Sequence, residues 1–291
     1  MRNIDADNIT QAVIARHAVA SDARLREVMT SLVQHLHAFA REVQLSESEW
    51  AGGLRFLTEC GRISSDERQE VVLLSDALGL SMLATALNHR KPTGCTESTL
   101  PGPFPIDGAA QREPGDDIGH GAGGEACYVR GSVRALDGTP VAGAEVQVWH
   151  AHADGRRDTQ PTGARGPCTR GVLVSDAGGD FQFKCVVPEP CAIAHDGPVG
   201  HMLQALGRHP WRPAHLHFMI TAPGFERLVT QVYRKGDQYL DADAVFGVRS
   251  SLVADWVRHD AGRTPDGQTS AVPFTTLDFT FVLNPTTGEK P

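Results

Sequence analysis

The chain has 291 residues, of which 41% are hydrophobic and 21% are charged, and its formal net charge is −8. A chain of this size and composition can bury a real core, in one large domain or two smaller ones. The acidic balance argues against a nucleic-acid partner or an anionic membrane surface. No apolar run approaches the roughly 18 residues that a membrane span needs, so we expect no membrane partner.

The six cysteines lie far apart and form no CxxC pair. The N-terminus, MRNIDADNIT, lacks the basic and apolar regions of a signal peptide. Without an export signal, we expect reduced thiols and a cytoplasmic location.

The first 90 residues are predicted to be helical. In residues 24–43 the apolar side chains recur at helical spacing; they are Leu25, Val28, Met29, Leu32, Val33 and Leu36. Ser46 with Glu49, and Ser64 with Glu67, have the spacing of capping boxes that open two further helices. Residues 71–89 are strongly apolar, and we expect this helix to pack against another helix or against a second copy of the chain.

The pattern changes at about residue 91. Residues 91–126 are rich in Gly and Pro and are predicted to form an irregular connection. Short alternating segments follow from residue 127 to 291. Residues 127–136 and 143–151 read as a pair of strands joined across a loop at Asp137–Gly138. The later strand candidates are residues 180–186, 214–220, 227–233 and 277–283. The predicted fold is mainly β with α: an antiparallel β-sandwich preceded by a helical region and a connection.

The segment RPAHLHF, residues 212–218, carries two histidines at i and i+2. Side chains on a strand alternate between its faces, so His215 and His217 are predicted to point the same way. Two neutral imidazoles on one side of a strand can form part of a metal site. Arg212 precedes the pair, and Gln231 lies on the next predicted strand, so polar groups surround it.

Several segments resemble the intradiol aromatic-ring dioxygenases, and most closely the hydroxyquinol and catechol 1,2-dioxygenases. They are GRHPWRPAHLHFMITAPG, LVTQVYRKGDQYLDADAVFGV, TESTLPGPFPIDGA, VRGSVRALDGTPVAGAEVQVWHAHADG, HDGPVGHMLQALGRHPW and LSDALGLSMLATALNH. The resemblance implies a β-sandwich enzyme that forms a homodimer through its N-terminal helices and cleaves an aromatic diol with O2.

Members of that family bind a non-haem Fe(III) through two tyrosinates and two histidines. The resemblance assigns the two histidine ligands to His215 and His217. It gives Arg212 the role of stabilising negative charge on the substrate, and it makes Gln231 the polar partner beside it. It also places the cavity loop at Leu100, Pro101, Gly102, Pro103 and Phe104, which we expect to contact the substrate.

Both tyrosine ligands are replaced in this chain. In WHAHADGRRDTQ the first tyrosine position is Arg157, and in VVPEPCAIAHDGP the second is Cys191. Arginine stays protonated and offers no lone pair, so Arg157 either reaches solvent or joins Arg212 in binding an anionic substrate group. Cys191 either completes a Cys-His-His metal set as a thiolate or fills the space of a tyrosine ring. Iron is the expected metal, while zinc, copper or no metal at all stay open.

Three hypotheses for the function follow. The first, which we favour, is a divergent intradiol dioxygenase that acts on a catechol- or hydroxyquinol-like ring at an altered metal site. The second is a non-oxidative enzyme on the same scaffold that uses Arg157 and Arg212 to bind an anionic aromatic substrate. The third is a non-catalytic homologue.

Overall fold

The structure is a computed structural model, and it describes residues 3–65, 68–100, 102, 110–119, 123–150 and 169–286. The chain divides into two compact units, Met1–Arg62 and Ile63–Pro291. The domain boundaries expected at residues 90 and 126 stay predictions. Arg157, Pro101, Pro103 and Phe104 lie outside the described residues.

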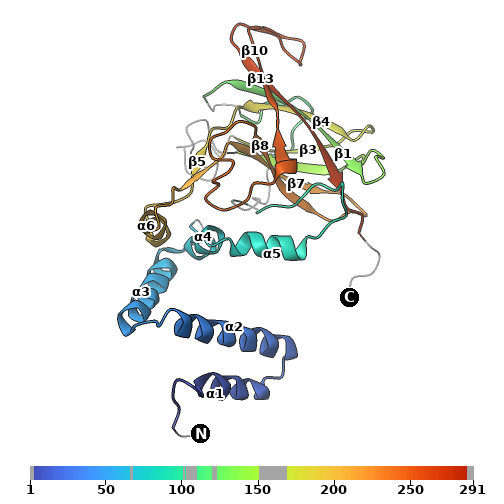
Figure 1. Cartoon of the computed structure of the whole chain (residues 1–291). Helices are drawn as coiled ribbons and strands as arrows, with labels where there is room; N and C mark the ends of the chain where they lie inside the picture. The colour runs from blue at the N-terminus through green and yellow to red at the C-terminus, as the bar shows by residue number, and fades with distance from the viewer. Residues whose placement is uncertain are drawn as a thin grey trace. The chain divides into compact units, whose positions relative to one another are not determined.

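The first unit consists of short and long helices (Figure 1): α1 (Ile9–Arg16), η1 (His17–Val19), α2 (Ala23–Glu42) and α3 (Glu47–Ile63). Helix α2 covers the predicted periodic segment. The capping box at the start of α3 is confirmed, because the Ser46 N–H donates to Glu49 Oε2 (2.9 Å) and the Glu49 N–H donates to Ser46 Oγ (3.3 Å). Apolar side chains of α2 are exposed in the single chain, among them Leu32 and Leu36.

The apolar segment 71–89 is not one helix. It forms α4 (Glu70–Ala77) and α5 (Leu80–Asn88), whose axes differ by 77°. Gly79 separates them in the left-handed conformation (φ 76°), which only glycine adopts at little cost. Helix α4 begins at Glu70; Glu67, on which the capping box expected at Ser64 depends, lies outside the described residues. No single helix of the described residues is long and apolar enough to cross a membrane; the bent pair α4–α5 passes that test only when combined.

The second unit is a two-sheet sandwich with α6 (Pro198–Ala205) beside it (Figure 1). One sheet has the order β10-β13-β1-β4 and the other the order β3-β2-β7-β8-β9. The bounds are β1 Ala126–Ala135, β2 Glu145–Trp149, β3 Arg170–Val174, β4 Asp180–Val186, β7 His215–Thr221, β8 Leu228–Arg234, β9 Val253–Ala254, β10 Trp256–His259 and β13 Phe274–Leu283. Four short strands form two separate ribbons: β5 Cys191–Ala192 with β6 Trp211–Arg212, and β11 Gly262–Arg263 with β12 Thr269–Ser270; a 3-10 turn, η2, spans Ser250–Leu252.

The predicted strands are present, but two of them pair differently from the prediction. β1 and β2 do not form a hairpin, because β1 pairs with β13 and β4 while β2 pairs with β3 and β7 in the other sheet. The sheets are mostly antiparallel, with two parallel pairs, β1–β13 and β8–β9. Alternation marks each strand locally, but it does not say which sheet the strand joins.

The sandwich core lies between the two sheets. Phe218 of β7 contacts Phe281 of β13 with ring centroids 4.7 Å apart, and it also contacts Phe181 and Phe183 of β4. Leu216, Phe218 and Ile220 point into this core and are fully buried. His215 and His217 alternate with them and therefore point to the outer face of the five-stranded sheet. One face of β7 therefore packs in the core, and the other face carries the two histidines.

Candidate active site

A row of side chains crosses four strands on the outer face of the five-stranded sheet. Trp149 of β2 is the register partner of Arg170 on β3 and of His217 on β7, and His217 is the partner of Gln231 on β8. Residues directly opposite one another on adjacent strands share a face. All four side chains are buried. The sheet therefore brings together residues that lie far apart in the sequence.

The two histidines lie side by side as predicted. Their Nε2 atoms are 3.0 Å apart, and each residue is 5% exposed. His215 Nδ1 lies 2.6 Å from the carbonyl oxygen of Pro213. A carbonyl can only accept, so His215 carries its proton on Nδ1 and its Nε2 presents a lone pair. Burial, followed by the charge of Arg212, lowers the pKa of His215 to about 3, so the ring is neutral near pH 7.

Arg212 is fixed by a buried ion pair with Asp243. Its Nε donates to Asp243 Oδ1 (2.9 Å) and its NH2 group donates to Oδ2 (3.1 Å), a bidentate contact. The NH2 group also donates to Gln231 Oε1 (2.7 Å), and NH1 lies 3.3 Å from His215 Nε2. Only NH1 is thus directed at the histidine pair, and the carboxylate beside it offsets much of the guanidinium charge.

Gln231 and Tyr233 complete this network. Gln231 accepts from Arg212 and Tyr233 through Oε1, and its Nε2 donates to the carbonyl oxygen of Leu100 (3.0 Å). Gln231 therefore links the arginine to the segment that leads into the predicted cavity loop. Burial raises the pKa of the Tyr233 hydroxyl. Tyr233 stays a neutral phenol that donates to Gln231, and so it does not replace a missing tyrosinate ligand.

Trp149 supports the face of His217. The two rings are parallel to within 2°, with centroids 5.1 Å apart. The guanidinium carbon of Arg170 lies 4.8 Å from the indole centroid. Because Arg170 and His217 flank Trp149 on neighbouring strands, the indole lies between a cation and the imidazole. Sequence reasoning missed both Trp149 and Arg170, since no local spacing connects them to His217.

Gly102 is the one residue of 101–109 that the structure describes, and it lies against the same histidine. A Cβ atom at this position would be 2.4 Å from Cε1 and 2.8 Å from Nδ1 of the His217 ring, and the backbone has φ +65°. Glycine is therefore required at this position for two reasons: the backbone has a positive φ, and a side chain would clash with the His217 ring. This places part of the predicted cavity loop beside the histidine pair.

Cys191 lies near Arg212 and is partly exposed. It is the register partner of Arg212 in the β5–β6 ribbon. The described ranges contain no group of three or more His, Cys, Asp or Glu side chains that could hold one metal ion. Cys191 as a third ligand therefore stays a prediction, as does any role of Arg157, which lies outside those ranges.

The histidine pair is spaced to bind one metal ion, whereas the sequence resemblance predicts that the two tyrosinates of the family's ferric site are missing. The two Nε2 atoms are 3.0 Å apart, which is close enough for both to reach one metal ion. Ferric iron favours hard anionic donors, and the residues predicted to occupy the two tyrosine positions are Arg157 and Cys191. The pair thus offers two imidazole ligands, and the absence of the two phenolates stays a prediction.

Comparison with known proteins identifies the family to which this β-sandwich and its site belong. The family model described as "Catechol dioxygenase N terminus" matches residues 22–96, and the model described as "Dioxygenase" matches residues 101–285. The chain belongs to the intradiol ring-cleavage dioxygenases, a family of oxidoreductases.

Two curated relatives align over nearly the whole chain. The 6-chlorohydroxyquinol 1,2-dioxygenase of Cupriavidus pinatubonensis is 54% identical, covering 98% of this chain and 100% of the relative. The hydroxyquinol 1,2-dioxygenase of Nocardioides simplex is 45% identical, covering 96% and 95%.

Two solved structures share the fold. Hydroxyquinol 1,2-dioxygenase from Pseudomonas putida DLL-E4 has a TM-score of 0.90 and 40% identity, covering 96% of this chain and 98% of that one. Catechol 1,2-dioxygenase from Pseudomonas arvilla C-1 has a TM-score of 0.82 and 25% identity, covering 98% and 93%. The predicted family and fold class are confirmed.

Proposed function

We propose that this chain is a divergent intradiol-type dioxygenase that acts on a hydroxyquinol- or catechol-like ring at an altered metal site. In this proposal His215 and His217 would hold the metal. The observation that carries it is the 3.0 Å separation of two buried imidazole nitrogens, one of which has its lone pair free of a proton. The names of the relatives support the substrate class.

Iron is the metal we propose, with zinc and copper as alternatives that the same imidazoles would accept. When bound, such a metal supplies the centre at which an aromatic diol becomes reactive toward O2. Arg212 NH1 is positioned to donate a hydrogen bond to a substrate hydroxyl oxygen close to His215, since it is the part of this guanidinium directed there. Gln231 holds the segment at Leu100 in place, and Trp149 orients the His217 ring.

The alternative is a non-oxidative enzyme that uses Arg157 and Arg212 to bind an anionic aromatic substrate. The loss of both phenolates favours it. The bidentate pairing of Arg212 with Asp243 weighs against it, because a neutralised guanidinium attracts a second anion weakly. We therefore place it second, and a non-catalytic role third.

Metal analysis and O2 uptake test the proposal together. Purified protein, loaded with Fe(II) under anaerobic conditions, is compared with a His215→Ala/His217→Ala variant and with the control His201→Ala, whose histidine is exposed on α6. We expect iron at up to about one ion per chain in the wild type and the control, loss of it in the double variant, and O2 consumption with hydroxyquinol. Iron that stays in the double variant, or turnover by metal-free protein, would overturn the proposal.

Restoring the phenolates tests whether their loss explains the altered site. An Arg157→Tyr/Cys191→Tyr variant is expected to bind Fe(III) and to gain the visible charge-transfer absorption of iron–tyrosinate coordination. The same variant with His215→Ala is the control and is expected to stay colourless. An uncoloured restored protein that contains iron would show that these two positions do not face the histidine pair.

The assembly is part of the same proposal. The apolar side chains of α2 are 53% exposed at Leu25, 46% at Leu32 and 54% at Leu36 in the single chain. A periodic apolar stripe of this kind on a helix needs a covering surface. We propose a homodimer through the N-terminal helices and a cytoplasmic location.

A further inference from the structure

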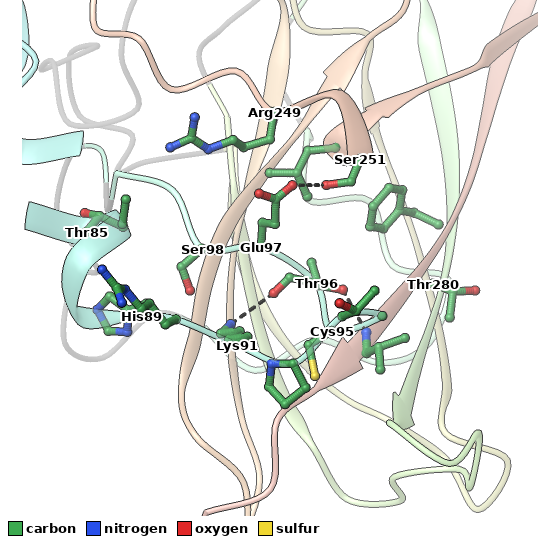
Figure 2. A pocket seen from close by; sticks show the side chains of 18 residues that line it. Thr85, His89, Lys91, Cys95, Thr96, Glu97, Ser98, Arg249, Ser251 and Thr280 are labelled. Atoms are coloured by element: carbon green, nitrogen blue, oxygen red, sulfur yellow. Dashed lines mark hydrogen bonds between the residues drawn. The ribbon is translucent and has the colours of Figure 1, made fainter. Parts of the chain in front are cut away.

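A cavity whose lining does not include the histidine pair lies within the unit Ile63–Pro291. It has a volume of about 600 Å³ and is bounded by the end of α5, residues 89–98, the turn η2 and strand β13 (Figure 2). None of the predicted site residues lines it. Nothing in the proposed dioxygenase function accounts for it.

The lining of this cavity is positively charged, although the whole chain is acidic. Arg90, Lys91 and Arg249 contribute three permanent cations, with His89 beside them, against the single carboxylate of Glu97. That carboxylate is already bound, because Glu97 Oε2 accepts from the hydroxyl of Ser251. Figure 2 shows Glu97 directed toward Ser251 while Lys91 is directed toward Thr96. The cavity wall therefore carries three cationic side chains against one carboxylate, whose hydrogen bond comes from a neutral hydroxyl.

Lys91 is the central cation of the cavity. Its Nζ donates to the carbonyl oxygen of Thr96 (3.0 Å), and within the described ranges this is its one hydrogen bond and it has no ion pair. The residue is half-buried, and burial lowers its pKa, while nearby Glu226 raises it. An ammonium group carries three donors, so two are left for a ligand. Because the Lys91 ammonium group is partly removed from water, an anionic partner stabilises it more than it would stabilise an exposed lysine.

Two further polar side chains on the cavity wall, those of Ser98 and Arg249, make no hydrogen bond within the described residues. The Ser98 hydroxyl oxygen is buried and makes no hydrogen bond with any described residue. Arg249 is half-buried, and its side chain forms neither an ion pair nor a hydrogen bond within the described ranges. Buried polar groups are normally hydrogen-bonded, so an unsatisfied hydroxyl beside unpaired cations is an exception that a bound acceptor would explain.

We propose that this cavity binds a small organic anion with two acidic groups, such as a dicarboxylate or a phosphate ester. One acidic group accepts from Lys91 and Ser98, and the second lies toward Arg249. The cavity binds this anion whether or not a metal is bound at His215 and His217, so the proposal is independent of the dioxygenase reaction. It assigns the chain a second ligand site on the sandwich.

Calorimetry with succinate, inorganic phosphate and uncharged dimethyl succinate tests this site on the full chain. We expect succinate or phosphate to bind and dimethyl succinate not to bind, with the stronger of the two anions showing which acidic group the cavity prefers. Lys91→Met is expected to weaken binding at least about tenfold, because a partly desolvated charge is lost. Lys91→Arg, which keeps the charge, is expected to retain most of the affinity.

The matched control is Lys235→Met, since Lys235 is an exposed lysine paired with Asp255 outside the cavity. It is expected to leave the affinity within about twofold of the wild type. Ser98→Ala provides a second variant that removes no charge and weakens binding less than Lys91→Met. Absence of anion binding in the wild type, or affinity that Lys91→Met and Lys235→Met change equally, would overturn the proposal.

Discussion

The buried ion pair between Arg212 and Asp243 makes Asp243→Asn a sensitive test of how the site is held. The two side chains are 7% and 2% exposed. Asp243 accepts from Arg212 Nε and NH2 and from the backbone N–H groups of Val245 and Gly247. Asparagine keeps one acceptor oxygen but places an NH2 group against donors and leaves the guanidinium charge uncompensated. We expect a loss of about 3–5 kcal/mol in the free energy of unfolding.

Urea denaturation provides the assay, with Asp255→Asn as the matched control. Asp255 pairs with Lys235 at 2.9 Å, the distance from Arg212 Nε to Asp243, but the two side chains are 72% and 65% exposed. The control should therefore cost no more than about 1 kcal/mol. If both variants lose the same small amount, the reasoning from burial is refuted.

The pH dependence gives an independent check on this pair. Burial raises the pKa of Asp243, but the charge and hydrogen bonds of Arg212 outweigh it and leave the pKa lowered. A folded-state pKa below the unfolded one adds stability at pH values above the unfolded pKa, which is about 3.9. That contribution is lost as the pH falls through the folded value. The difference between wild type and Asp243→Asn should therefore shrink below about pH 4.

Three further predictions concern the site and the assembly. Gly102→Ala should lower iron affinity at least about tenfold by displacing the His217 ring, whereas Gly138→Ala, also at positive φ but with no neighbour within 4 Å, should leave iron content unchanged in the same metal analysis. A double-mutant cycle of Arg170→Met and Trp149→Leu should give a coupling energy of about 0.5–2 kcal/mol by urea denaturation; additive losses would argue against the cation–indole contact. Leu32→Glu/Leu36→Glu should yield monomers by light scattering, and an unchanged dimer would exclude α2 as the interface.

Local patterns predicted the parts of the structure that depend on near neighbours in the chain. Side-chain alternation placed His215 and His217 on one face of β7, and the spacing of Ser46 and Glu49 located the start of α3. Both inferences follow from backbone geometry over a few residues. The prediction of one helix over residues 71–89 failed for the same reason: the apolar pattern continues through Gly79 and does not indicate the sharp bend there.

Sequence by itself therefore determined the family, most of the strands and the histidine pair, because each is written in a contiguous motif; the replacement of both tyrosine positions stays a prediction. Tertiary structure alone decided that β1 and β2 join different sheets, that Asp243 neutralises Arg212 from 31 residues away, and that Arg170, Trp149 and His217 form one stack. Such contacts depend on which strands and loops pair across the sandwich. That choice is made by the packing of the whole core, and no local spacing encodes it.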